Sequence, residues 1–538
     1  MQRRVQQVVL AWAAMVLCVA MCSGSAWAKN SLTVKTASGK VAGKWSADHQ
    51  VREFLGIAYA APPVGPLRWQ PPQPAAKWHG VRSATDFGAR CMQPAFYKDM
   101  VFRDPGQSED CLTLNIWTPA KDPHAKLPVM VWIYGGGFST GATSEPRQDG
   151  EHLAANKGVL IVSMNYRLGV FGFFALPALM QESPVHAAGN YGLMDQRAAL
   201  QWVQHNIARF GGDPKNVTIF GESAGSMSVS AQMASPQSQG LFARAMGESG
   251  GMFLADGFPT AQEQAQQDAA FMRKTFGTED LAKLRAVSAA ELLRAAAQPG
   301  LMRLFWPNVD GAFLPQSASA IYAAGEQAHV PLLAGTNRDE GTAMVVYAPQ
   351  KVTLASWQAM AKQQFGANAD AFLQAYAANN DAQAVRAAED YAGDRFIAYS
   401  TWAWLEAQVQ TGGQPVYRYR FDLGSPGDPN HSVESGAFHS DDIEYVFGNL
   451  DSRAGAYWRP EDRQLSEAMQ SYWTNFAKTG DPNGPGLPHW PTYNAADGWQ
   501  VLHLDAAIQA RPDAHRDRDL FLQKYWFKPV PTGASQPK

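Results

Sequence analysis

The stretch Val217-Thr218-Ile219-Phe220-Gly221-Glu222-Ser223-Ala224-Gly225 decides the fold class of this chain. Its first four residues predict a buried strand, and residues 226–233 predict a helix directly after the turn. Gly221 and Gly225 supply the small residues that a sharp strand-to-helix turn requires, because larger side chains would collide where the backbone folds back. Such a turn lifts the Ser223 hydroxyl above a sheet and places a helix N-terminus beneath it. The stretch therefore predicts an α/β protein with an exposed nucleophilic serine.

Further strands and helices alternate around this turn. Short β-rich runs predict strands at 129–134, 159–163, 217–220, 330–334 and 416–419, and the central ones are apolar without polar alternation, which indicates burial on both faces. Residues 190–209 predict a helix in which Asp195 lies near the start, where it suits the helix dipole, and in which Asp195 and Gln196 belong to a polar side. Strands alternating with helices indicate a mostly parallel sheet covered on both faces, with ligands beyond the carboxyl ends of its strands.

Two long segments interrupt this alternation. Residues 262–303 and 354–410 are rich in Ala and Gln, have helical periodicity and contain few strand signals. We expect them to form helical excursions that roof the active site, because variable insertions usually shape access to a site that rests on the sheet.

Length and composition indicate a large globular protein. The chain has 538 residues, of which 46% are hydrophobic and 17% are charged, and its formal net charge is −3. This balance is incompatible with a disordered chain, and the absence of a basic surplus argues against nucleic acid as a partner. Without repeats or low-complexity linkers, residues 29–538 are predicted to form a single domain.

The first 28 residues have the features of a secretory signal. Arg3 and Arg4 precede an apolar run from Val8 to Cys22, and Ala26-Trp27-Ala28 matches a small-x-small cleavage pattern. A retained membrane anchor is the alternative, but the run is short for a bilayer span. We expect cleavage after Ala28 and an exported protein, periplasmic or secreted, with no stable membrane anchor.

Two cysteines remain after removal of the signal, which contains Cys18 and Cys22. Cys91 and Cys111 could form one disulfide that closes a loop of about 20 residues, which suits an oxidising compartment and contributes about 3 kcal/mol. The alternative is a pair of buried thiols. Two cysteines without a CxxC pair make a structural zinc site implausible.

A glycine-rich segment supplies candidate donors for an oxyanion. Tyr134-Gly135-Gly136-Gly137-Phe138 follows an apolar strand, and three glycines allow bare backbone to approach a substrate closely, although a merely flexible loop would have the same composition. A nucleophilic serine also needs an acid and then a histidine later in the chain. Spacing alone does not choose among the histidines after Ser223, which are His329, His431, His439, His489, His503 and His515.

Several segments together resemble the type-B carboxylesterases, the family that also contains the cholinesterases. The cysteine-containing stretch 109–119 and the serine stretch 220–225 are similar to the two family signatures. Segments similar to the family's follow in family order along nearly all of the mature chain, at 165–169, 192–197, 335–342 and 472–477. The resemblance implies an α/β-hydrolase fold with helical insertions over the active site.

The resemblance also assigns the site residues. It implies a triad of Ser223, Glu340 and His439, with Glu340 rather than Asp339 as the acid. By the same resemblance, the N–H groups of Gly136, Gly137 and Ala224 form the oxyanion hole, and Ser249 supports the triad from behind. Glu222 is given no chemical role. The residues expected to be structural are the ion pairs Arg68–Glu109 and Arg167–Asp195 and the acidic run Asp441, Asp442 and Glu444, which could also modulate His439 electrostatically.

The expected activity is hydrolysis of carboxylic esters, short-chain or aryl, through an acyl-enzyme on Ser223, without metal or organic cofactor. One alternative is a non-catalytic binding protein, like the adhesion relatives of the cholinesterases, but those have lost triad residues. A metallohydrolase is disfavoured because no HExxH motif is present. The sequence does not indicate an oligomeric state.

Departures from the family narrow the substrate. Tyr134 begins the oxyanion segment where many lipases and esterases have histidine, as in the cholinesterase branch. Residues 92–110 contain Phe96, Tyr97 and Phe102 but no tryptophan to hold a quaternary ammonium, so cholinesterase activity is not expected. Residues 301–306, where the family places part of its acyl pocket, predict an apolar or aryl acyl group.

Overall fold

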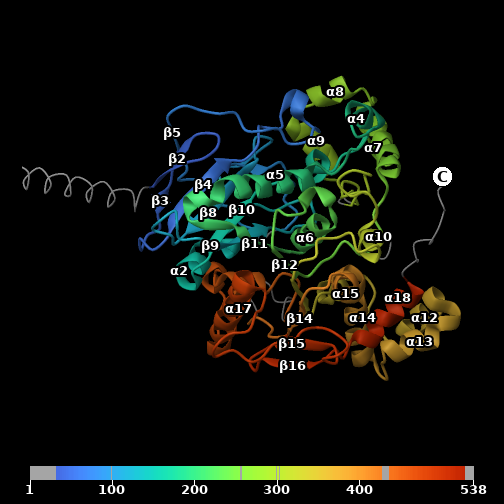
Figure 1. Cartoon of the computed structure of the whole chain (residues 1–538). Coiled ribbons are helices and arrows are strands. Elements are labelled where there is room, and N and C mark those ends of the chain that lie inside the picture. Colours follow the sequence, from blue (N-terminus) through green and yellow to red (C-terminus); the bar gives the residue numbers. More distant parts are fainter. Residues whose placement is uncertain are drawn as a thin grey trace, which may run out of the picture.

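A mixed sheet runs through the centre of the computed structural model, which describes residues 32–97, 100–254, 257–298, 300–301, 303–426 and 436–526 (Figure 1). The predicted export signal at 1–28 lies outside these residues. Within the described residues the sheet has eleven strands. In spatial order they are β16 (Gln509–Pro512), β15 (Gln500–Leu504), β14 (Val416–Phe421), β13 (Leu332–Asn337), β12 (Arg244–Glu248), β11 (Gly212–Glu222), β9 (Leu127–Ile133), β10 (Leu160–Met164), β8 (Thr113–Thr118), β4 (Arg52–Ala58) and β3 (Lys44–Trp45).

Neighbouring strands are parallel from β10 to β15, and β8, β4, β3 and β16 pair antiparallel at the two edges. The five β-rich runs of the sequence are all strands of this sheet, as predicted. Two smaller sheets lie outside it and consist of β1 (Thr33–Lys35), β2 (Lys40–Ala42) and β5 (Val81–Ser83), and of β6 (Arg90–Cys91) and β7 (Gln107–Ser108). The sheet and its helices form the α/β-hydrolase fold that the sequence predicted.

The direction of the connections places helices on both faces of the sheet. The chain passes from β9 through α2 (Glu151–Lys157) to β10, and then returns past β9 through α5 (Tyr191–Asn206) to β11. Because both crossovers are right-handed by the general rule, α2 and α5 lie on opposite faces. Helix α6 (Ala224–Ala234) continues on the α5 face and packs on β11 and β12, whereas α17 (Pro460–Thr479) contacts α2 and covers the other face.

Helix α5 corrects one expectation. Asp195 and Gln196 were predicted to lie on a polar side, but both are fully buried. Asp195 also lies beyond the first turn, and its carboxylate accepts hydrogen bonds from Arg167 instead of complementing the helix dipole. Because Asp195 is paired with Arg167, its charge can be buried on a helix face that the sequence pattern had predicted to be polar.

The two predicted helical excursions are present. The first contains α7 (Ala261–Phe276), α8 (Leu281–Ala286) and α9 (Ala289–Ala296). The second contains α12 (Leu354–Phe365), α13 (Ala369–Ala375), α14 (Asp381–Gly393), the π-helical turn η6 (Asp394–Ala398) and α15 (Tyr399–Thr411). The remaining α-helices of the described segments are α3 (Gly169–Gly172), α4 (Pro177–Glu182), α10 (Ala318–Ala323), α11 (Thr342–Val346), α16 (Ile443–Phe447) and α18 (Arg516–Tyr525).

The reversal of strand order at β9 positions the site. Strand β9 has β10 on one side and β11 on the other, so the loops after β9 and β11 diverge and leave a crevice at their carboxyl ends. Beneath that crevice, Trp132 of β9 packs against Phe220 of β11 at 4.8 Å between ring centroids and against Phe447 of α16 at 4.9 Å. Since all three rings are fully buried, they fix the relative positions of the elements around the crevice.

No helix among the described residues is both long and apolar enough to cross a membrane.

Candidate active site

Ser223 occupies the turn between β11 and α6. Its backbone has φ 56° and ψ −120°, a conformation that non-glycine residues rarely adopt. A Cβ added to Gly225 would lie 1.9 Å from the carbonyl oxygen of Ile133, and one added to Gly221 would lie 2.5 Å from the same oxygen. Side chains at these two positions would therefore collide, as predicted, and the group that they would meet belongs to the neighbouring strand β9. Only glycine at both positions allows the turn to approach β9 so closely.

Three side chains from distant parts of the chain meet at this turn. The hydroxyl of Ser223 donates to Nε2 of His439 at 3.0 Å, and Nδ1–H of His439 donates to Oε2 of Glu340 at 2.6 Å. Glu340 follows the end of β13, and His439 lies in the loop between β14 and α16. These contacts form a continuous hydrogen-bonded chain from a serine through an imidazole to a carboxylate, which is the arrangement of an activated nucleophile.

Two donors hold the second oxygen of the Glu340 carboxylate. Oε1 accepts a hydrogen bond of 2.5 Å from the Ser249 hydroxyl and one of 2.9 Å from the backbone N–H of Asn337. Ser249 follows β12 with φ 56°, and its hydroxyl bonds the oxygen of Glu340 that does not contact His439. Because both oxygens of this buried carboxylate are bonded, its orientation toward His439 is fixed.

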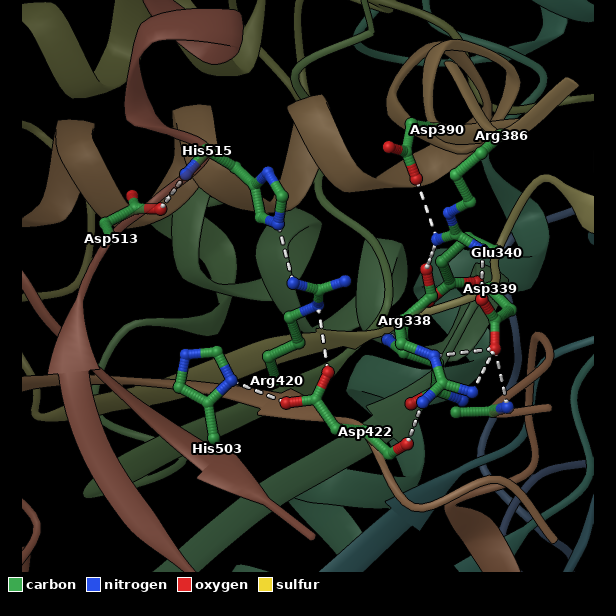
Figure 2. Close-up of polar contacts among 12 residues, drawn as sticks. Arg338, Asp339, Glu340, Arg386, Asp390, Arg420, Asp422, His503, Asp513 and His515 are labelled. Atoms are coloured by element: carbon green, nitrogen blue, oxygen red, sulfur yellow. Dashed lines mark hydrogen bonds and ion pairs between the residues drawn. The ribbon is translucent and has the colours of Figure 1, made fainter. Parts of the chain in front are cut away.

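Asp339, the neighbouring acid, has a different position. Figure 2 shows its carboxylate between Arg338 and Arg386, with bonds of 2.8 and 2.6 Å. One of its oxygens also accepts from the N–H of Ala437 at 2.9 Å, and the Asp339 N–H donates to the Ala437 carbonyl at 2.9 Å. Asp339 therefore clamps the loop that carries His439, and it is Glu340 that contacts the imidazole.

Two other candidate histidines take part in structural contacts. Nδ1–H of His503 donates to Asp422 at 2.5 Å, and Nε2 of His515 accepts from Arg420 at 2.6 Å (Figure 2). Burial and the surrounding arginines lower the pKa of His515 to about 2, so its ring stays neutral. His431 lies outside the described residues.

Glu222 requires a correction, because it was given no role from the sequence. Its Oε1 lies 3.3 Å from Nε2 of His439, the same nitrogen that accepts from Ser223. Burial lowers the pKa of His439, but the charges of Glu222 and Glu340 outweigh it and raise that pKa to about 9. Burial has the opposite effect on a carboxyl group and raises the pKa of Glu222 to about 8, although the adjacent His439 acts to lower it. The sequence feature that could have indicated this contact is the position of Glu222 as the last residue of the strand before Ser223.

The acidic run after His439 belongs to the framework, as predicted. Arg453 pairs with Asp441 at 3.0 Å and with Glu444 at 2.9 Å. Asp442 accepts hydrogen bonds from Asn337 and from the Tyr419 hydroxyl. Burial raises the pKa of Asp442 to about 6, and its charge contributes to the raised pKa of His439.

The glycine segment after β9 forms one wall of the cavity above Ser223. Gly136 and Gly137 have φ values of 103° and 62°, and a Cβ on Gly136 would lie 2.3 Å from the Thr140 carbonyl. Both glycines line the cavity together with Ser223 and Ala224. Two backbone segments, the glycine loop and the serine turn, thus converge where an oxyanion would form. Tyr134 is buried and stacks on Tyr166 with 4.6 Å between ring centroids.

The cavity has a volume of about 460 Å³, and both helical excursions contribute to its walls. Arg303 comes from the end of the first and Trp306 from just after it, and Phe396 and Ile397 come from the second. The Phe396 ring contacts the His439 imidazole edge-on, with 4.9 Å between centroids. Phe305 faces away and packs against Phe271 and Phe174, so only part of the 301–306 segment belongs to the pocket. No feature of the sequence indicated Phe396.

Covalent and ionic contacts support the surrounding framework. Cys91 and Cys111 form a disulfide, which confirms the pairing expected from the cysteine count. Arg68 pairs with Glu109 at 2.6 Å, and Arg167 pairs with Asp195 at 2.8 Å, so both predicted ion pairs are confirmed. The disulfide anchors the loop whose residues Tyr97 and Met100 reach the cavity.

Comparison with known proteins identifies a family for this chain. Residues 30–520 match the carboxylesterase family. The para-nitrobenzyl esterase of Bacillus subtilis (strain 168) is 38% identical over 510 residues, covering 91% of this chain and 99% of the relative. The fumonisin B1 esterase of Sphingopyxis macrogoltabida is 38% identical over 505 residues, covering 90% of this chain and 88% of the relative. A solved PNB esterase structure is similar with a TM-score of 0.77 and 36% identity, covering 92% of this chain and 99% of that one.

The fold and these matches together define a carboxylic ester hydrolase of the α/β-hydrolase superfamily. Within that superfamily, the chain belongs to the carboxylesterase family, whose type-B members it resembled from its sequence.

Proposed function

We propose that this protein is an exported serine carboxylesterase that hydrolyses short-chain or aryl esters through an acyl-enzyme on Ser223. The observation that carries the proposal is the hydrogen-bonded chain from Ser223 through His439 to Glu340, which opens into a cavity of about 460 Å³. The names of the relatives, para-nitrobenzyl esterase among them, support esters with an aromatic group as substrates.

In the first half of the reaction, Oγ of Ser223 attacks the ester carbonyl while its proton passes to Nε2 of His439. The resulting oxyanion is stabilised by the N–H groups of Gly136, Gly137 and Ala224, and each such donor contributes roughly 3 kcal/mol to transition-state stabilisation. The bond to the alcohol oxygen then breaks, and His439 gives its proton to that oxygen. The acyl group remains on Ser223 as an ester.

In the second half, water attacks the acyl-enzyme and loses a proton to Nε2 of His439. The acyl–Oγ bond breaks, Ser223 recovers its proton from the imidazole, and the carboxylic acid leaves. Glu340 keeps the imidazole in the required tautomer and stabilises its cation in both halves. Its support is the pair of hydrogen bonds from Ser249 and Asn337.

Replacement of the nucleophile tests the proposal. Ser223→Ala should fold like the wild type, with the same circular dichroism spectrum, and should lose turnover of benzyl and aryl esters, because no other group can accept the acyl chain. Wild-type-like turnover by the folded variant would refute the mechanism.

Export is tested by expressing the full chain with its first 28 residues and by fractionating the cells. The proposal predicts a periplasmic or extracellular protein whose N-terminal residue is Lys29. An intact N-terminus in the membrane fraction would favour a retained anchor instead.

A further inference from the structure

Arg303 differs in its ionic contacts from the other charged residues that line the active-site cavity. Arg147 pairs with Glu145 at 2.7 Å, Asp339 is held by two arginines, and Glu222 and Glu340 face His439. In the parts of the chain that the structure describes, no carboxylate lies within ion-pair distance of Arg303. An unpaired guanidinium on the wall of a cavity is available to a ligand.

An aromatic contact fixes the position of this guanidinium. Its central carbon lies 5.1 Å from the centroid of the Trp306 ring, which in turn packs edge-on against Phe138 at 5.5 Å. Phe138 directly follows Gly137, one of the candidate oxyanion donors. Arg303 is therefore connected through two rings to the loop that would hold the carbonyl oxygen of the substrate. Since Arg303 and Ser223 line the same cavity, an acyl group on Ser223 would share that cavity with the positive charge.

The mouth of the same cavity is apolar. Tyr97, Met344 and Tyr347 line it, and their side chains are 43%, 47% and 66% exposed. Large apolar side chains are not usually left in water in such a group unless a ligand or partner covers them. Among the described residues that line it, the cavity thus combines exposed apolar side chains with one cation that has no carboxylate partner.

We propose that Arg303 binds a carboxylate on the acyl part of the substrate, so that the preferred substrates are monoesters of dicarboxylic acids with an apolar alcohol. This inference rests on the proposed function, because it requires the acyl group to be attached to Ser223. The guanidinium presents two parallel N–H donors that match the two oxygens of a carboxylate, and Trp306 holds its plane in place. The apolar alcohol then lies against the side chains at the mouth.

The test compares three benzyl esters of similar length, two that end in a carboxylate and one that is neutral. Monobenzyl esters of glutaric and adipic acid are the charged probes, benzyl valerate is the neutral probe, and release of benzyl alcohol is measured. The variants are Arg303→Gln and Arg303→Lys. Arg294→Gln is the matched control, because Arg294 is also an exposed cation at the end of the first excursion but is not among the residues that line the cavity.

For the charged probes, Arg303→Gln should lower kcat/KM roughly tenfold, mainly through KM, as expected for loss of one charge-assisted contact at an accessible site. Benzyl valerate turnover should not change, Arg303→Lys should retain part of the preference, and Arg294→Gln should behave like the wild type. About 0.5 M salt should weaken the preference of the wild type for the charged probes.

Equal kcat/KM values of wild type and Arg303→Gln for the charged probes would overturn the inference. If the wild type still hydrolysed benzyl valerate, the proposed esterase function would stand. An equal loss with charged and neutral probes would also overturn it, since Arg303 would then act on structure and not on the carboxylate. If the wild type hydrolysed neither kind of ester, the proposed function itself would fail.

Discussion

Oε1 of Glu222 lies 3.3 Å from Nε2 of His439, so the imidazole that faces Ser223 has one carboxylate on each of its nitrogens. Glu340 contacts Nδ1 and orients the ring, whereas Glu222 contacts the nitrogen that exchanges the proton with Ser223. Both charges favour the imidazolium, which explains why the pKa of His439 is raised to about 9 despite burial.

Neutralising Glu222 should therefore shift the pH dependence of the reaction. The neutral imidazole is the base, so activity rises with pH as His439 loses its proton. In Glu222→Gln the pKa of His439 should fall, and the acidic limb of kcat/KM should move to lower pH by about one unit. Glu389→Gln removes a carboxylate that pairs with Arg386 instead of His439 and should leave the limb in place. The measurement is kcat/KM for a neutral aryl ester between about pH 5 and 10. An acidic limb that stays in place in Glu222→Gln would show that this carboxylate does not control His439.

The turn at Ser223 should not tolerate a methyl group at Gly225. The added Cβ would lie 1.9 Å from the Ile133 carbonyl, so Gly225→Ala has to displace either β9 or the start of α6. We expect a loss of about 3 kcal/mol in the free energy of unfolding and loss of ester turnover, because the Ala224 N–H would move.

Gly158→Ala is the matched control for this substitution. Gly158 caps α2 at φ 65°, and an added Cβ there would have no neighbour within 4 Å. It should cost about 1 kcal/mol and leave turnover unchanged. Denaturant unfolding and ester hydrolysis are measured on both variants. If Gly225→Ala were no less stable than Gly158→Ala, close packing of the turn on β9 would not be essential.

The disulfide should stabilise both the fold and the entrance to the cavity. Cys91 and Cys111 are separated by 20 residues, and the loop that they close supplies Tyr97 and Met100 to the cavity wall. Replacing both cysteines with serine should lower the free energy of unfolding by about 3 kcal/mol and raise KM for benzyl esters. Reductant should reproduce the change in the wild type and have no effect on the double variant. An unchanged unfolding midpoint in the double variant would contradict this role.

The turn could be predicted from the sequence because its determinants are local. Gly221, Ser223 and Gly225 lie within five residues, between a β-rich run and a helical one, so their spacing alone indicates the geometry. The central strands were predictable for a similar reason, since burial on both faces leaves an uninterrupted apolar run.

Local sequence patterns could not identify the two triad partners of Ser223. Glu340 and His439 are 99 residues apart, and they meet because Asp339, just after β13, clamps the loop before α16 at Ala437, a contact that no periodicity encodes. Resemblance to a family supplied these two residues. Glu222 was missed because the direction of its side chain depends on the turn after it, and Asp195 was misjudged because its partner Arg167 lies outside the helix.

The most direct test of the serine mechanism is a burst experiment on the purified mature protein with a chromogenic short-acyl aryl ester, followed by organophosphate treatment and mass analysis. We predict a burst equal to the enzyme concentration, complete inhibition, and one phosphoryl adduct on the peptide that contains Ser223. Folded protein that shows no burst, no turnover and no adduct would contradict the account, because the chain from Ser223 to Glu340 would then not activate the serine.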